Sequence, residues 1–305
     1  MATRLPARSL RSLLALPLFC AGISPVVAGP ADYTYRTGSS EVRLTFSATD
    51  ERDHGVATLQ STDFAVVDKD VIVRKFQSFT RSDWTKLEIA IVVDASGSVT
   101  PRFREELGEV VNLVSQTAGI PDENLAMFSF HGQQTTMLCA GNCRASGAAE
   151  RPPERSANGL TPLFDSIVLA SGFLGKRGDD HSQKILILFS DGADTISENS
   201  MRNAIAASQD LEVEIDCIDL NRHFHTGSAV LQALARSTGG RYFAQPDGAS
   251  RALQTILEGL RASYTVSYRL PTHIQGFHSI RILPTHNLNL QFRSRSGYYY
   301  PDRTR

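Results

Sequence analysis

The chain has 305 residues, of which 41% are hydrophobic and 21% are charged, and its formal charge is -1 at pH 7. This composition is ordinary for a globular protein with one large domain or two smaller ones. A charge so close to zero gives no basis for binding nucleic acid or an anionic membrane surface, so we expect neither partner.

Residues 1–28 have the pattern of a secretory signal peptide. Three arginines are followed by an apolar stretch over residues 13–23 and by the small-residue end Val26-Val27-Ala28. We therefore expect cleavage near Ala28 and a mature protein that is secreted or periplasmic. The apolar stretch is too short to span a bilayer, and no later segment approaches the roughly 18 apolar residues that a transmembrane helix needs, so no integral membrane segment is expected.

Residues 29–85 are predicted to form a small β module. Strands are expected at residues 42–48, 63–68 and 71–79, because apolar and β-branched residues there are separated by polar turns. About 40 patterned residues bury only a modest core by themselves, so this module is expected to need a partner.

Residues 86–263 alternate between strand and helix patterns. The runs at residues 89–94 and 184–190 are almost wholly apolar, as in strands buried on both faces of a parallel sheet. Such alternation predicts a mostly parallel sheet with helices on both faces. Further strands are expected at residues 125–130, 134–138, 213–220 and 241–243, and helices from residue 101 to about 118, from residue 162, and at residues 198–209, 228–237 and 249–263.

Residues 264–305 return to the two-residue period of strands, at residues 264–270, 278–284 and 290–296. This segment is also too small to fold alone. Its expected partner is the N-terminal module, since each has an apolar face and no core of its own, which would make one β-sandwich interrupted by the α/β domain. Tyr298–Tyr300 is interpreted either as a strand end packed on that core or as an exposed aromatic patch.

Polar side chains with oxygen donors follow the two buried strands. Asp94, Ser96 and Ser98 occupy alternate positions in the tight loop DASGS, and Asp191 follows the strand at residues 184–190. Because ligands of open α/β sheets bind beyond the carboxyl ends of the strands, these residues and Thr161 are expected at one edge. Oxygen donors suit a small, hard divalent cation such as Mg²⁺ or Mn²⁺.

The five residues Asp94, Ser96, Ser98, Thr161 and Asp191 resemble the metal-ion-dependent adhesion site of von Willebrand factor type A domains. The resemblance implies a Rossmann-like α/β fold. It also implies that the three hydroxyl groups contact the cation directly, while Asp94 and Asp191 hold it mostly through hydrogen bonds and water. A cation held in this way would remain a Lewis acid for an acidic side chain of a protein ligand.

The flanking segments DFAVVD, Thr238-Gly239-Gly240 and Arg295–Tyr299 are similar to those of the bacterial VWFA-related family of the acidobacterial type. This resemblance covers roughly residues 41–300. It adds little about function, because that family is defined by sequence.

The remaining candidate sites are weaker. Cys139 and Cys143 flank a turn-forming spacer, and in an oxidising compartment they are expected to form a local disulfide. Cys217 lies in a predicted buried strand and is expected to pack as a small hydrophobic residue. His223 and His225 have HxH spacing, but without further ligands such a pair is more often a solvated loop than a metal site.

Three functions remain open from the sequence. The favoured one is an exported binding module, not an enzyme, that captures an acidic side chain through its metal. A second is an envelope scaffold in which the metal only rigidifies the loops. A third is a Mg²⁺-dependent phosphoryl transferase or hydrolase using Asp94 or Ser96, against which stand the serine two positions after Asp94 and the absence of a GxSxG motif around Ser96.

Overall fold

The structure is a computed structural model, and all described residues belong to one compact unit, residues 32–305. It describes residues 40–82, 87–96, 120–144, 146, 159–177, 182–221, 225–244, 249–260 and 262–300. Within these ranges, no helix combines the length and the apolar character required to cross a bilayer.

A six-stranded sheet forms the middle layer of the α/β domain, with strand order β10-β9-β8-β5-β6-β7. All neighbouring pairs are parallel except β6 and β7, which are antiparallel at one edge. The strands are β5 (Leu87–Asp94), β6 (Leu125–His131), β7 (Gln134–Ala140), β8 (Gln183–Ser190), β9 (Val213–Asp219) and β10 (Tyr242–Phe243). The prediction of a mostly parallel sheet is confirmed.

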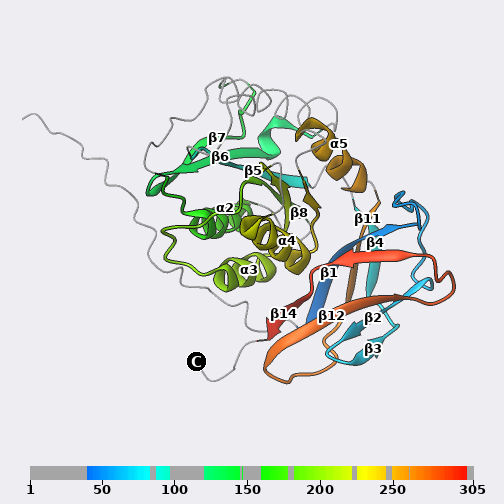
Figure 1. Cartoon of the computed structure of the whole chain (residues 1–305). Helices are drawn as coiled ribbons and strands as arrows, with labels where there is room; N and C mark the ends of the chain where they lie inside the picture. Colours follow the sequence, from blue (N-terminus) through cyan, green and yellow to red (C-terminus); the bar gives the residue numbers. More distant parts are fainter. Residues whose placement is uncertain are drawn as a thin grey trace, which may run out of the picture. The chain divides into compact units, whose positions relative to one another are not determined.

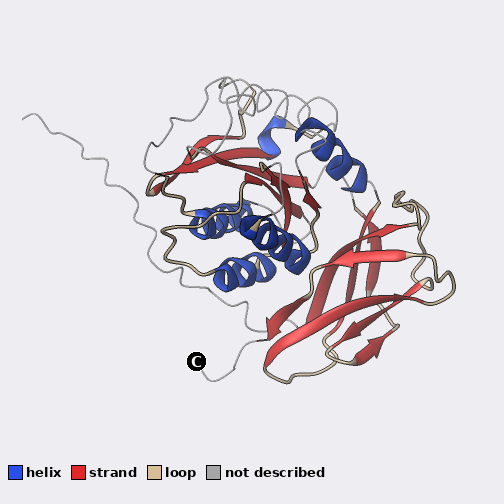
Figure 2. Cartoon of the chain, in the orientation of Figure 1, coloured by secondary structure: helices blue, strands red, loops and turns tan. Residues whose placement is uncertain are grey.

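Helices cover both faces of this sheet, as predicted (Figures 1 and 2). One core cluster packs alternate residues of β5, β6 and β8 against α5, and the other packs the opposite faces of these strands against α2, α3 and α4. The strands are apolar on both sides because both sides are buried. In the described part of the chain the helices are α2 (Leu163–Arg177), α3 (Met201–Asp210), α4 (Thr226–Thr238) and α5 (Ala249–Leu260), and a 3-10 turn covers Asp122–Asn124.

The N- and C-terminal strands together form a β-sandwich, which confirms that the α/β domain is inserted in it. One sheet has the order β13-β1-β11-β4 and the other β14-β12-β2-β3, so each contains strands from both ends of the chain. They enclose one shared apolar core. The strands are β1 (Glu41–Thr49), β2 (Phe64–Asp68), β3 (Val71–Val73), β4 (Ser78–Arg81), β11 (Ser263–Arg269), β12 (Gly276–Pro284), β13 (Gln291–Ser294) and β14 (Gly297–Tyr300).

The prediction of a single strand at residues 71–79 is wrong. The segment divides into β3, which pairs with β2, and β4, which pairs with β11 in the opposite sheet. Phe76 and Phe79 both pack on Phe64, with ring centroids 5.0 and 5.4 Å away, so the apolar pattern continues while the chain crosses between sheets.

Two helix boundaries also differ from the expected ones. Helix α3 begins at Met201 and not near residue 198, because Ser200 is its N-cap and accepts a hydrogen bond from the Asn203 amide at 3.2 Å. Helix α5 ends at Leu260, and Ser263 already begins β11. Tyr298 and Tyr300 pack against the sandwich core, whereas the Tyr299 side chain is exposed.

Candidate metal centre

Asp94 closes the central strand β5, and its side chain is fully buried. Its Oδ1 accepts a hydrogen bond from the Ser96 amide at 2.9 Å, and its Oδ2 accepts one from the Ser190 hydroxyl at 3.0 Å. Ser190 is the last residue of β8, and the parallel register that pairs Val93 with Phe189 puts it beside Asp94. The ends of these two strands therefore hold the carboxylate in one orientation.

The electrostatic environment of Asp94 disfavours its negative charge. Burial raises the pKa of this carboxyl to about 6, although the hydrogen bonds from Ser96 and Ser190 oppose that shift. The negative charge of Asp191 raises the pKa further. No Lys, Arg or His among the described residues forms an ion pair with Asp94. An added cation would stabilise the ionised form of this side chain.

Asp191 begins the loop that follows β8. Its Oδ1 accepts a hydrogen bond from the Ala193 amide at 2.9 Å. The amide of Gly192, which lies between them in the chain, donates to the Ser190 hydroxyl at 3.0 Å. Gly192 has a φ of 74°, and a Cβ there would lie 2.2 Å from the carbonyl oxygen of Gly227. Only glycine therefore allows the Asp191 loop to rest on the first turn of α4.

Thr161, just before α2, is tied to the same loop through Thr195. The Thr161 amide donates to the Thr195 hydroxyl at 2.8 Å, and the Thr195 amide donates back to the Thr161 carbonyl at 3.0 Å. The two hydroxyl oxygens are 3.3 Å apart, and the Thr161 side chain is buried. This reciprocal pairing fixes the start of α2 against the loop that carries Asp191.

Hydrogen bonds thus join Asp94 to Ser96 and, through Ser190, to the amide of Gly192 beside Asp191. Thr161 is bonded to Thr195, which lies on the same loop as Asp191. Ser98, the fifth predicted metal ligand, lies outside the described residues. Ser190 and Thr195 take part in these hydrogen bonds although the sequence pattern does not single them out. The signal available for them is a polar residue closing an apolar strand and a hydroxyl residue in the motif FSDGADT.

The donor set of the four predicted ligands that the structure describes suits a hard cation. It offers two carboxylates and two hydroxyl oxygens, the ligand chemistry of Mg²⁺ and Mn²⁺ sites. Within the described ranges, no three His, Cys, Asp or Glu side chains are grouped so that they could hold a metal ion. The hydroxyl groups would therefore have to complete the coordination.

His225 is the N-cap of helix α4. Its Nδ1 accepts a hydrogen bond from the Ser228 amide at 3.2 Å, and its Nε2 contacts the Asn221 carboxamide. Both ring nitrogens are therefore engaged, which leaves none for an HxH metal pair. His223 lies outside the described residues.

The structure joins Cys139 and Cys143 in a disulfide with an S–S distance of 2.06 Å. Both residues pack against the core cluster that includes α5. Cys217 is free and fully buried in β9, where burial raises the pKa of its thiol. Cys217 thus contacts apolar neighbours, in keeping with its expected packing role.

Comparisons with known proteins gave structural likeness only. No protein-family model matches the sequence, and no curated protein matches it either. Among solved structures, mussel byssus proximal thread matrix protein 1, solved with a zinc-occupied MIDAS motif, has a TM-score of 0.48 and 17% identity over 63% of this chain and 50% of its own. The chain thus spans about half the length of that protein.

Two further structures are matched over almost their full length. BatB from Bacteroides thetaiotaomicron has a TM-score of 0.43 and 15% identity, over 57% of this chain and 97% of its own. The manganese-loaded TRAP protein of Plasmodium vivax has a TM-score of 0.46 and 16% identity, over 78% of this chain and 100% of its own.

Proposed function

We propose that this protein is an exported binding module of the von Willebrand factor type A kind, and not an enzyme. Asp94, Ser96, Ser98, Thr161 and Asp191 would hold Mg²⁺ or Mn²⁺, and an acidic side chain of a protein ligand would complete the coordination. The observation that carries this proposal is the environment of Asp94: a fully buried carboxylate, close to a second one, with no cation of its own among the described residues.

The hydroxyl-rich donor set explains why capture, and not turnover, is the proposed activity. Hydroxyl ligands would neutralise the cation only in part, so the bound ion would keep affinity for an external carboxylate. The serine hydrolase alternative would need a histidine base for Ser96. Two of the described histidines have other roles, because His225 caps α4 and His278 is bonded to Asp68 in the sandwich.

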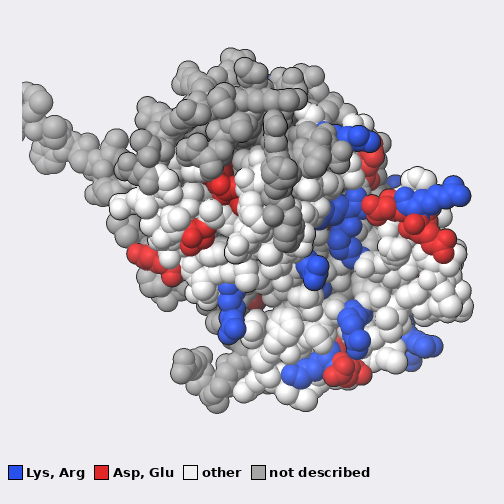
Figure 3. All heavy atoms as spheres, viewed as in Figure 1, with Lys and Arg blue, Asp and Glu red and all other residues white. Residues whose placement is uncertain are grey.

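Two further observations support the cellular setting and the class of partner. A Cys139–Cys143 disulfide is suited to an oxidising compartment outside the cytosol, which agrees with the predicted signal at residues 1–28. On the face shown in Figure 3, Lys and Arg side chains are interspersed with Asp and Glu. Mixed charge of this kind favours a protein partner over nucleic acid.

The test is calorimetric titration of the mature protein with Mg²⁺ and with Mn²⁺, beside the variant Asp94→Ala. We expect saturable binding by the wild type and none by the variant. Binding that raises the melting temperature but supports no interaction with acidic peptides would favour the scaffold function instead. Equal binding by wild type and variant would contradict the proposed site.

A further inference from the structure

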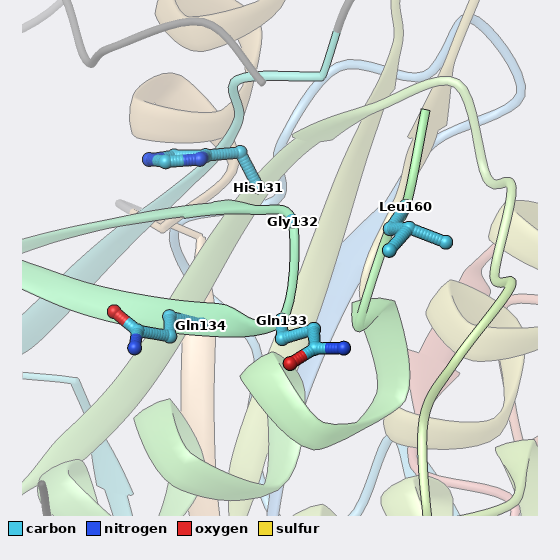
Figure 4. A pocket seen from close by; sticks show the side chains of 5 residues that line it. All are labelled: His131, Gly132, Gln133, Gln134 and Leu160. Carbon is cyan, nitrogen blue, oxygen red and sulfur yellow. The ribbon is translucent and has the colours of Figure 1, made fainter. Parts of the chain in front are cut away.

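A pocket of about 410 Å³ opens at the turn between β6 and β7. Its walls are the hairpin residues His131, Gly132, Gln133 and Gln134 on one side and Leu160 on the other (Figure 4). We call it the hairpin pocket. Its volume lies within the range of roughly 300–1,000 Å³ that is usual for sites that bind small groups.

Both walls of the hairpin pocket adjoin elements that carry proposed metal ligands. In the parallel pair β5–β6, Asp94 is in register with Phe130, and the Ala95 amide donates to the Phe130 carbonyl at 2.9 Å. His131 is the next residue along β6. On the other wall, Leu160 directly precedes Thr161, whose amide is held by Thr195.

The turn itself is tightly constrained. Strand β6 ends at His131 and β7 begins at Gln134, so only Gly132 and Gln133 connect them. Gly132 has a φ of 60°, which is the conformation that the first residue of a two-residue II′ turn requires. A pocket wall built on such a turn is pre-organised, so little ordering would be needed when a ligand binds.

The described lining of the pocket combines amide side chains with one histidine and one leucine. Gln133 and Gln134 are exposed, and within the described part of the chain no hydrogen bond engages the Gln133 carboxamide. No Asp or Glu is among the described lining residues, so none of these five residues would repel an acidic ligand. Leu160 supplies one apolar surface.

We propose that the hairpin pocket is a specificity subsite for the protein ligand. It receives a residue that neighbours the metal-bound acidic side chain, and it selects an uncharged polar side chain that exchanges hydrogen bonds with the Gln133 carboxamide. This inference rests on the proposed function, because the metal centre places the ligand beside the pocket. Metal binding itself does not depend on Gln133.

The test uses a library of short peptides with a fixed central Asp, selected on the immobilised protein in Mn²⁺ and again in a chelator. Gln133→Glu keeps the shape of the side chain and adds a negative charge, so it is expected to shift one selected position towards Lys or Arg. Gln133→Ala is expected to weaken the best wild-type peptide about three- to tenfold, the effect of one neutral hydrogen bond. Gln60→Glu adds the same charge at an exposed residue between β1 and β2, and it should leave the selection unchanged.

Calorimetry with Mn²⁺ alone separates the two proposals. If the wild type binds Mn²⁺ and selects peptides only with metal, and Gln133→Glu binds Mn²⁺ equally but selects different neighbours, the inference is supported. If Gln133→Glu and Gln133→Ala select the same peptides as the wild type with the same affinity, the subsite is refuted while the metal function stands. If the wild type selects no peptide in a metal-dependent manner, the proposed function fails, and the subsite with it.

Discussion

Asp68 in the sandwich and Asp94 in the α/β domain are both fully buried, and each closes a strand, yet their neighbours differ. Asp68 accepts hydrogen bonds from the hydroxyls of Tyr268 and Tyr298 at 3.0 and 2.8 Å, and it lies 3.2 Å from His278 Nδ1. The other ring nitrogen of His278 is 2.6 Å from the carbonyl oxygen of Ile274. The sandwich thus supplies its own hydrogen-bond partners for the buried Asp68 side chain.

In the described part of the chain, no Lys, Arg or His forms an ion pair with Asp94. Its carboxylate accepts hydrogen bonds from Ser96 and Ser190, and the negative charge of Asp191 raises its pKa. A buried carboxylate that is not compensated costs free energy. The Asp68 cluster therefore has its polar partners within the described residues, whereas a cation bound at the proposed Asp94 site would supply a counter-charge that these residues do not.

The largest expected loss of stability follows substitution of Asp68 in the sandwich. Asp68→Asn keeps the size of the side chain but replaces one acceptor oxygen with an NH2 donor among the buried partners Tyr268, Tyr298 and His278, and we expect it to lower the unfolding free energy by about 3 kcal/mol. Urea denaturation at neutral pH measures this loss. Asp70→Asn is the matched control, because Asp70 is exposed and its ion pair with Arg281, at 3.7 Å, is worth less than about 1 kcal/mol. Equal effects of the two variants would show that the buried contacts of Asp68 contribute no more stability than an exposed ion pair.

The same substitution at Asp94, to Asn, should raise the unfolding free energy and not lower it. In a chelator and above pH 6, we expect Asp94→Asn to be more stable than the wild type, by up to about 3 kcal/mol. The folded-state pKa of Asp94, about 6, is above the ordinary value of 3.8. The folded wild type therefore binds more protons than the unfolded chain between these values, so its stability falls as the pH rises through this window and stays lower above it.

Melting temperatures measured from pH 4 to pH 8 test this difference. The melting temperature of the wild type should fall between about pH 4 and pH 6, because the pKa of Asp94 is raised to about 6 in the folded state. The fall should be smaller in Asp94→Asn, which lacks this carboxyl. Added Mg²⁺ or Mn²⁺ should reverse the order above pH 6, because only the wild type gains stability by binding. If Asp94→Asn is the less stable protein in chelator, Asp94 already has a stabilising partner, and the contrast with Asp68 is lost.

Local sequence patterns predict the architecture of both regions better than they predict their polar contacts. The apolar runs that form β5 and β8 identify buried parallel strands, and the residues at their ends are the proposed metal ligands Asp94 and Asp191. Pairing between distant segments leaves no such local signal. Asp68 and His278 are 210 residues apart in sequence, and only the antiparallel pairing of β2 with β12 brings them together.

The division of residues 71–79 into β3 and β4 has the same explanation. The two-residue period reports that alternate side chains are buried, but it does not report which of two sheets each strand joins. The role of Ser190 is hidden from the sequence for a related reason. A serine that closes an apolar strand has many uses, and its bond to Asp94 follows from the register of β5 on β8.

The smallest expected effect concerns Ser190, which orients Asp94 without being a proposed ligand. Ser190→Ala removes the hydrogen bond to Asp94 Oδ2 and leaves the Gly192 amide without its acceptor. We expect Mn²⁺ affinity to fall about tenfold, as for other residues that orient metal ligands, and stability to fall by about 1 kcal/mol. Calorimetric titration with Mn²⁺ and urea denaturation measure the two effects.

Ser171→Ala is the matched control for Ser190→Ala, because it removes a buried hydroxyl whose partner, Ser208, belongs to the helical layer. It should lower stability by a similar amount and leave Mn²⁺ affinity unchanged. If both variants lower stability alone, the strand-end network is only structural, and Asp94 does not need Ser190 to bind a cation. If Ser190→Ala alone weakens Mn²⁺ binding, the orientation of Asp94 is part of the site, which is the feature that the self-contained Asp68 cluster lacks.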